Sequence, residues 1–262
     1  SSFTITASTI DDITPEATET LILNVGSKSG TGSITDNDVT LTTSVASLTA
    51  FSTCTGSAST AQSFTFSGNI YSGTVTVTAP TGFEISQTQN GTYSASIAYS
   101  FGGTSVAATT VWVRAKSTAT NGLNGNVTVA STGATTQNVA VSVTVNAIPT
   151  ITVSPSSSTI VVGGSVTLTA SGGSTYAWSP TTGLSNSNTS SVTASPSSNI
   201  SYTVTGTSVG GCSNTALATV TVNAALAAGA IAADQTICVG ATPATLTSIT
   251  PASGGVGTIN YQ

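Results

Sequence analysis

The sequence predicts an all-β chain of tandem antiparallel β-sandwiches arranged end to end. Apolar and polar residues alternate with a period of two in many short segments, the pattern of half-buried antiparallel strands. Clusters of Gly, Asn, Pro and Ser recur at strand-length intervals and supply turns. No segment shows a helical period, and two motifs return 77 residues further along the chain.

Four segments carry the clearest alternation, with apolar residues on one face and mainly Thr, Ser or Ala on the other: 73–80, 138–145, 165–170 and 200–204. Thr suits the outer face because it is β-branched and polar at once. We therefore expect the Val, Leu, Ile and Tyr residues of these segments to lie in sandwich cores.

The two recurring motifs define the domain organisation. Val143-Thr-Val-Asn-Ala147 returns as Val220-Thr-Val-Asn-Ala224, and Thr159-Ile-Val-Val-Gly163 returns as Thr236-Ile-Cys-Val-Gly240. Both offsets are 77 residues (220 − 143 and 236 − 159), which indicates a repeated domain. Each Val-Thr-Val-Asn-Ala copy ends an alternating run, so we interpret it as a last strand. The predicted segments are the end of one domain (1–39), two complete sandwiches (40–146 and 147–223) and the start of a further repeat (224–262).

Ionisable residues are scarce: 3 Lys and Arg, 8 Asp and Glu and no His make 4% of the chain charged, against about 25% in an average protein. The absence of His excludes Ser-His-Asp triads, Cys-His dyads and His-ligated zinc. Three basic residues are too few to neutralise a nucleic-acid backbone or to form a basic membrane-binding patch. No apolar run reaches the about 18 residues that span a bilayer. We expect no enzyme, no nucleic-acid partner and no membrane insertion.

Six of the eight acidic residues lie in the first 38 positions. Residues 11–23 read Asp-Asp-Ile-Thr-Pro-Glu-Ala-Thr-Glu-Thr-Leu-Ile-Leu, and residues 30–38 read Gly-Thr-Gly-Ser-Ile-Thr-Asp-Asn-Asp. This combination resembles the C-terminal part of a Calx-beta domain, in which two acidic clusters meet at one end of the sandwich and can bind calcium. The resemblance implies a calcium site from Asp11, Asp12, Glu16, Asp36 and Asp38, incomplete because the family's other ligands come from earlier strands. Clustered carboxylates also suit calcium chemically; the alternative is a solvated acidic loop.

Residues 40–146 resemble a domain that recurs in large secreted proteins of Bacteroidetes. The resemblance rests on four stretches: Leu48-Thr-Ala-Phe51, Gln62-Ser-Phe-Thr-Phe-Ser-Gly68, Ala79-Pro-Thr-Gly-Phe-Glu-Ile-Ser86 and Thr110-Val-Trp-Val-Arg114. Glu84 is the only acidic residue of this segment, and we predict that it pairs with Arg114 at the end of the sandwich. A catalytic Glu84 is the alternative, but glycoside hydrolysis needs a second carboxylate.

Residues 147–223 resemble immunoglobulin-like or PKD-like repeats of the same bacterial proteins. The resemblance rests on Tyr176-Ala-Trp-Ser-Pro180, Gly183-Leu-Ser185, Ser201-Tyr-Thr-Val204 and Gly211-Cys-Ser213. It implies that Trp178 is the core aromatic residue of a central strand. A ligand-stacking Trp178 is the alternative.

Three cysteines, Cys54, Cys212 and Cys238, form an odd set without a Cys-x-x-Cys motif, which argues against metal or thioredoxin-like chemistry. In an extracytoplasmic protein Cys212 could bridge to Cys238; the alternative is a free thiol or a partner outside the chain. In the repeats just mentioned an Ile-Cys-x-Gly element often accompanies a Gly-Cys near the last strands. Val161 occupies that cysteine position here, which implies that Cys212 lacks a mate in its own domain and that Cys238 finds its mate beyond the chain.

The order of the segments resembles a fragment of a giant modular cell-surface adhesin, such as the gliding-motility adhesins of Bacteroidetes exported by type IX secretion. We therefore predict a structural stalk segment of an extracellular adhesin or surface filament, which supports cell adhesion or gliding. The expected partners are neighbouring repeats of the same chain, surface glycans and other surface proteins. Two alternatives stay open: carbohydrate-binding accessory modules of a secreted polysaccharide-degrading enzyme, and a filament subunit joined by strand complementation.

Overall fold

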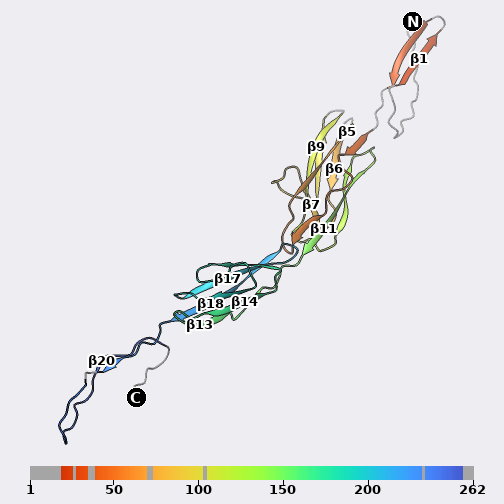
Figure 1. Ribbon diagram of the computed structural model, residues 1–262. Helices are drawn as coiled ribbons and strands as arrows, with labels where there is room; N and C mark the ends of the chain where they lie inside the picture. The colour runs from red at the N-terminus through yellow and green to blue at the C-terminus, as the bar shows by residue number, and fades with distance from the viewer. Residues whose placement is uncertain are drawn as a thin grey trace. The chain divides into compact units, whose positions relative to one another are not determined.

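A computed structural model of the chain describes residues 19–25, 28–34, 39–69, 73–102, 105–231 and 234–255. All regular secondary structure in these ranges is β-strand, and the chain divides into two compact units, residues 1–147 and 148–262. Each unit contains an immunoglobulin-like β-sandwich (Figure 1). The predicted all-β fold class is therefore confirmed, whereas the finer division into four segments stays a prediction.

The sandwich of the first unit packs a four-stranded sheet on a five-stranded one. The four-stranded sheet has the order β3 (Thr40–Thr43), β5 (Gln62–Asn69), β9 (Val106–Ala115), β7 (Phe83–Ser86). The five-stranded sheet has the order β4 (Phe51–Cys54), β11 (Gln137–Asn146), β10 (Asn124–Ala130), β6 (Gly73–Thr78), β8 (Ser96–Phe101). The predicted alternation is confirmed, because the valines at 75, 77, 139, 141 and 143 are at most 3% exposed.

Aromatic side chains fill the centre of this first core. Phe51 and Phe83 meet edge to face with ring centroids 5.7 Å apart, and Phe66 meets Tyr99 in the same way at 5.2 Å. Such pairs contribute about 0.5–1.5 kcal/mol beyond the burial of their area. The core is therefore held by aromatic packing between the two sheets.

The sandwich of the second unit is smaller. One sheet has the order β12 (Thr152–Ser154), β14 (Val166–Ser171), β16 (Ser191–Ala194), and the other β13 (Ser157–Val161), β18 (Ser213–Asn223), β17 (Ile200–Thr207), β15 (Thr175–Ser179). Trp178 is 3% exposed and Tyr202 is fully buried, so the predicted core role of Trp178 is confirmed. The predicted central strand is wrong, because β15 lies at the edge of its sheet. Its indole Nε1 donates to the Thr189 carbonyl at 2.9 Å, and the Tyr202 hydroxyl donates to the Thr182 carbonyl at 2.6 Å. Both core aromatics thus hold the loop between β15 and β16.

The first strand of each sandwich is divided between the two sheets. In the first sandwich β3 pairs antiparallel with β5, whereas β4 joins the other sheet and runs parallel to β11, with Cys54 opposite Asn146. In the second, β12 pairs antiparallel with β14 and β13 runs parallel to β18, with Val161 opposite Asn223. The first and last strands of each sandwich are therefore parallel neighbours within otherwise antiparallel sheets. Sequence alternation does not report this direction, because its period is two in both arrangements.

Two short pairs of strands lie outside both cores. β1 (Glu19–Val25) and β2 (Lys28–Ile34) form an antiparallel hairpin, and β19 (Ala230–Ile231) pairs antiparallel with β20 (Ser248–Thr250). After residue 223, six large apolar residues of the described part of the chain are at least half exposed: Leu226, Ile231, Ile237, Val239, Leu246 and Ile249. These side chains therefore belong to neither of the two cores.

Candidate functional site

The predicted calcium ligands Asp11, Asp12, Glu16, Asp36 and Asp38 all lie outside the described residues. Within the described ranges no group of three or more His, Cys, Asp or Glu side chains is placed to hold a metal ion. The calcium site therefore stays a prediction.

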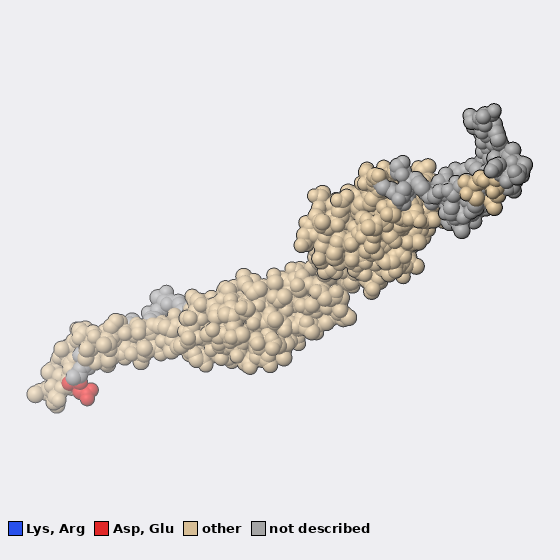
Figure 2. All heavy atoms as spheres, turned by 90° about the horizontal axis from the view of Figure 1, so that it is seen from above, with Lys and Arg blue, Asp and Glu red and all other residues tan. Residues whose placement is uncertain are grey.

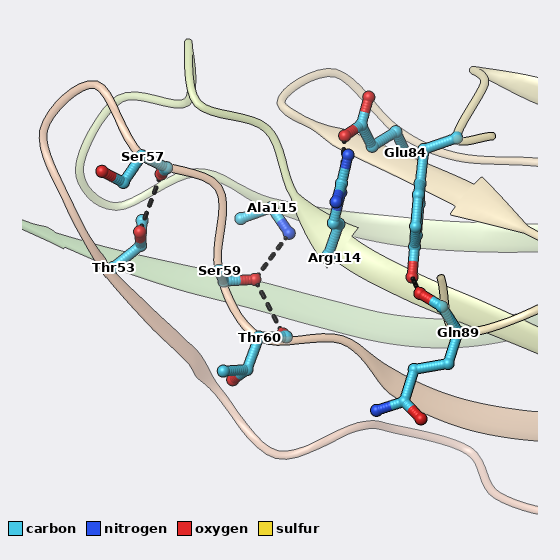
Figure 3. Close-up of polar contacts among 9 residues, drawn as sticks. Thr53, Ser57, Ser59, Thr60, Glu84, Gln89, Arg114 and Ala115 are labelled. Carbon is cyan, nitrogen blue, oxygen red and sulfur yellow. Dashed lines mark hydrogen bonds and ion pairs between the residues drawn. The ribbon is translucent and has the colours of Figure 1, made fainter. Parts of the chain in front are cut away.

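The charged pair of the first sandwich lies on the outer face of its four-stranded sheet. Glu84 on β7 and Arg114 on β9 are direct cross-strand neighbours, and Arg114 Nε donates to Glu84 Oε1 at 2.8 Å (Figure 3). Their side chains are 18% and 35% exposed, respectively. The predicted pair is confirmed. It arises because Val111, Val113 and Ala115 of β9 point into the core, which turns Arg114 outward.

Tyr93, which the sequence did not single out, completes this cluster from the loop between β7 and β8. Arg114 Cζ lies 3.8 Å from the centroid of the Tyr93 ring, close enough for a cation–π contact. The Tyr93 hydroxyl donates to the Gln89 carbonyl at 2.8 Å. Burial raises the pKa of the Tyr93 phenol and the Glu84 charge raises it further, while the Arg114 charge opposes both. The phenol therefore stays neutral at physiological pH.

A buried hydroxyl fastens the neighbouring loop to the same strand. Ser59 is 7% exposed; its Oγ accepts a hydrogen bond from the Ala115 amide at 2.9 Å and donates to the Thr60 carbonyl at 3.0 Å (Figure 3). Thr53 Oγ1, on β4, donates to the carbonyl of Ser57 in this loop at 2.7 Å. The loop that follows β4 is thus tied to the end of β9. No sequence pattern marked Ser59, because one serine in a Ser-rich chain carries no local signal.

The cluster of Glu84, Arg114 and Tyr93 joins a loop to the sheet. Arg114 is engaged by a carboxylate and a ring at once, and Glu84 is the only acidic residue between positions 39 and 147. The alternative role of Glu84, in glycoside hydrolysis, needs a second carboxylate about 5–9.5 Å from the first. Residues 39–147 contain no second carboxylate side chain. Through its contact with the Tyr93 ring, Arg114 connects the β7–β8 loop to the outer face of the sheet. On the face shown in Figure 2, the described residues carry neutral side chains except at one acidic region.

The cysteines differ in state. Cys54 is disulfide-bonded, and Cys212 is 1% exposed and also disulfide-bonded. Cys238 is exposed and free. The predicted Cys212–Cys238 bridge is therefore wrong, and the alternative of a free thiol holds for Cys238.

No family model matches the chain, and no curated protein matches it either. Among solved structures, similarity extends to a 282-residue C-terminal fragment of intimin in complex with the intimin-binding domain of its receptor (16% identity, 71% of this chain, 66% of that chain, TM-score 0.35). It extends also to titin domains I67–I69 (8% identity, 70% of this chain, 66% of that chain, TM-score 0.34). A third is a Ca²⁺-stabilised adhesin with which an Antarctic bacterium binds ice (18% identity, 81% of this chain, 58% of that chain, TM-score 0.30).

The chain thus spans slightly under two thirds of the intimin fragment and of the titin segment. Identities and TM-scores this low carry no argument about function, so the fold assignment rests on the strand pairing of the chain itself. None of the described segments is a helix of the length and apolar character that a membrane crossing needs.

Proposed function

We propose that this chain is a structural stalk segment of an extracellular repeat adhesin or surface filament, with no catalytic role. The observation that carries the proposal is the parallel pairing of the first and last strands in both sandwiches, β4 with β11 and β13 with β18. This arrangement suits a protein that is pulled from its two ends.

Tension along a chain of sandwiches pulls the first strand of each one backward and the last strand forward. Where these strands are parallel neighbours, the pull acts along the ladder, and all its hydrogen bonds resist together instead of opening one by one. Backbone bonds at the ends of the strands lengthen both ladders: Thr55 N to Asn146 O at 2.9 Å, Val162 N to Asn223 O at 2.9 Å and Thr219 N to Ser156 O at 3.0 Å. We infer that both sandwiches resist extension better than antiparallel pairs of the same size.

The disulfide-bonded state of Cys54 and Cys212 supports a location outside the cytoplasm, because disulfides persist in oxidising compartments. The scarcity of Lys and Arg leaves few cleavage sites for common proteases. The proposed partners are neighbouring repeats of the same chain, surface glycans and other surface proteins. The finer proposal is a gliding-motility adhesin of Bacteroidetes exported by type IX secretion.

Single-molecule pulling from the two ends of the chain tests the stalk. The experiment is done with a reductant, because the disulfide bonds of Cys54 and Cys212 would otherwise keep tension off the residues that they enclose. Under these conditions we expect two separate unfolding events from residues 39–147 and 148–223. Val162→Pro removes the N–H that donates to Asn223 and lowers the force of the second event, whereas the matched variant Val162→Ala keeps the N–H and the force. Equal forces for the two variants, or extension without discrete events, would contradict the proposal.

Calcium at Asp11, Asp12, Glu16, Asp36 and Asp38 is part of the same proposal, because an ion would stiffen the first domain. Thermal melting of a longer protein that contains the whole first domain is compared with and without EGTA. We expect EGTA to lower the melting temperature, and Asp11→Asn with Asp12→Asn to reduce that difference. No shift with EGTA would reject calcium and favour a solvated acidic loop.

The two alternatives make different predictions. Binding to a glycan array above background would favour carbohydrate-binding modules. Concentration-dependent assembly of the 262-residue chain in sedimentation velocity would favour a filament subunit. A stalk segment shows neither.

A further inference from the structure

Strand register aligns Cys54 with Val161, and the sequence repeat aligns Val161 with Cys238. Asn146 and Asn223 are equivalent residues of the Val-Thr-Val-Asn-Ala motif (146 + 77 = 223), and in the parallel strand pairs Cys54 lies opposite Asn146 and Val161 opposite Asn223. The second motif places Cys238 where Val161 stands (161 + 77 = 238). The position at the end of the first parallel strand thus holds Cys in the first sandwich and Val in the second, and the sequence repeat aligns Cys238 with the same position.

This position lies at the end from which the chain leaves the sandwich. Asn146 and Asn223 are the last residues of β11 and β18, the final strands of their sandwiches. Val161 is 48% exposed, so a side chain at this position reaches the surface. We call it the exit-end position.

Cys212 lies at the opposite end of its sandwich. It directly precedes Ser213, the first residue of β18, and Asn214 Nδ2 donates at 3.1 Å to the carbonyl of Pro149, where the chain enters. The Cys212 backbone is held in this turn by Ser208, whose Oγ accepts from the Cys212 amide at 3.3 Å. We call this the entry-end position.

The two positions of one sandwich are too far apart for a disulfide. Ser213 and Asn223 are separated by 10 residues of extended strand (223 − 213), which corresponds to about 33 Å. The Cα atoms of a disulfide lie within about 7 Å of each other. The pairing that the repeat resemblance implied, between an Ile-Cys-x-Gly cysteine and a Gly-Cys cysteine of the same domain, is therefore excluded by the register of β13 and β18.

We propose that Cys238 is a cross-linking position whose thiol bonds an entry-end cysteine of another sandwich, in a turn before a last strand such as the one that holds Cys212. Two observations support it: the thiol of Cys238 is exposed and free, and the equivalent Cys54 is disulfide-bonded. The disulfide forms whether or not the sandwiches bear tension, so its test is independent of the pulling experiment.

The bond forms by thiol–disulfide exchange with a disulfide oxidant of the extracytoplasmic compartment. The Cys238 thiolate attacks one sulfur of the oxidant and releases the other as a thiolate, which leaves a mixed disulfide. The thiolate of the entry-end cysteine then displaces the remaining oxidant sulfur. The two cysteines lose two protons and two electrons, and the oxidant becomes a dithiol.

Peptide mapping without reductant tests the proposal on the protein isolated from its native surface, with thiols blocked by N-ethylmaleimide before denaturation. A protease of broad specificity is needed because the chain has only 3 Lys and Arg. We expect the Cys238 peptide to be bonded to a cysteine peptide that contains neither Cys54 nor Cys212. Maleimide-labelled Cys238, or Cys238 bonded to Cys212, would overturn the proposal.

A recombinant version of the 262-residue chain tests the geometry by itself. Under native oxidising conditions we expect labelling at Cys238 alone, and none in Cys238→Ser. Val161→Cys creates an exit-end thiol in the sandwich of Cys212, and we expect peptide mapping to find the added label at position 161 itself, with Cys54 and Cys212 unlabelled. Label at Cys54 and none at the substituted position 161, because the new thiol has taken Cys212 as its partner, would overturn the separation of the two positions.

Discussion

The sandwich of residues 39–147 contains Glu84, Arg114 and Lys116, whereas residues 148–223 contain no Asp, Glu, Lys or Arg at all. Both sandwiches bury alternate residues of the same kind of strand, but they fasten their loops differently. The first holds its β7–β8 loop by a charged pair under Tyr93, and the second holds its β15–β16 loop by Trp178 and Tyr202. A sandwich of this fold thus needs no charged side chain, provided that the polar atoms of its core aromatics reach backbone carbonyls.

The largest expected effect comes from removing a core aromatic of either sandwich. Trp178→Ala loses the packed ring and the bond to Thr189, and Phe83→Ala loses the ring that contacts Phe51. We expect each to cost about 3–5 kcal/mol, and only in the unfolding transition of its own sandwich. Urea unfolding followed by circular dichroism and by the fluorescence of Trp112 checks this. A shift of both transitions by either variant would contradict separate cores.

The hydroxyls of two buried tyrosines, Tyr202 in the second sandwich and Tyr99 in the first, differ in their hydrogen bonding. Tyr202→Phe removes the bond to Thr182 and should cost about 1–2 kcal/mol. The buried hydroxyl of Tyr99 in the first core has no hydrogen-bond partner within the described part of the chain. Tyr99→Phe should therefore be neutral or stabilise by up to about 1 kcal/mol. Equal losses in the two variants would show that the hydroxyl of Tyr99 is bonded in solution.

Both hydroxyls also predict an alkaline response. Burial raises the pKa of Tyr99 and of Tyr202 in the folded state. Below the pKa of an unfolded tyrosine, near 10, both states are neutral and the free energy of unfolding does not change with pH. As the pH rises from there through the folded pKa, the free energy of unfolding falls, because the unfolded chain ionises at a lower pH than the folded one. At pH 10.5 the loss is below about 1 kcal/mol per tyrosine. Denaturant titrations from pH 9 to 11 measure this loss. In the control variant Tyr202→Phe, the free energy of unfolding of residues 148–223 should depend less steeply on pH.

Acid is expected to leave the stability of the second sandwich unchanged. Residues 148–223 contain no carboxylate side chain, so their unfolding transition should stay constant between pH 7 and pH 3. A loss of stability of this sandwich in that range would reveal a contribution from outside it.

The smallest expected effect belongs to the ion pair. Glu84→Gln should cost at most about 1 kcal/mol, because both side chains are partly exposed and the pair is screened. Raising NaCl from 50 mM to 500 mM should reduce the difference between wild type and Glu84→Gln. A salt-independent difference above that size would indicate that Glu84 is held by more than Arg114.

Much of the fold could be predicted because burial follows the alternation of side chains. Val75, Val77, Leu168 and Tyr202 are inside, as their period-two patterns predicted. The pairing of Glu84, the only acidic residue of its sandwich, with Arg114 was also predicted. Tyr93 and Ser59 could not be found in this way, because their partners come from other strands and one Tyr or Ser carries no local pattern.

The sequence by itself determined the fold class and the inward faces of the strands, since a strand exposes alternate residues whatever its partner. Only the tertiary structure decided which strands are neighbours and in which direction. That decision made β13 a parallel partner of β18, separated Val161 from Cys212 by the length of a strand, and showed that Cys238 is not bonded to Cys212. Distances between segments far apart in sequence depend on strand register, which local alternation does not encode.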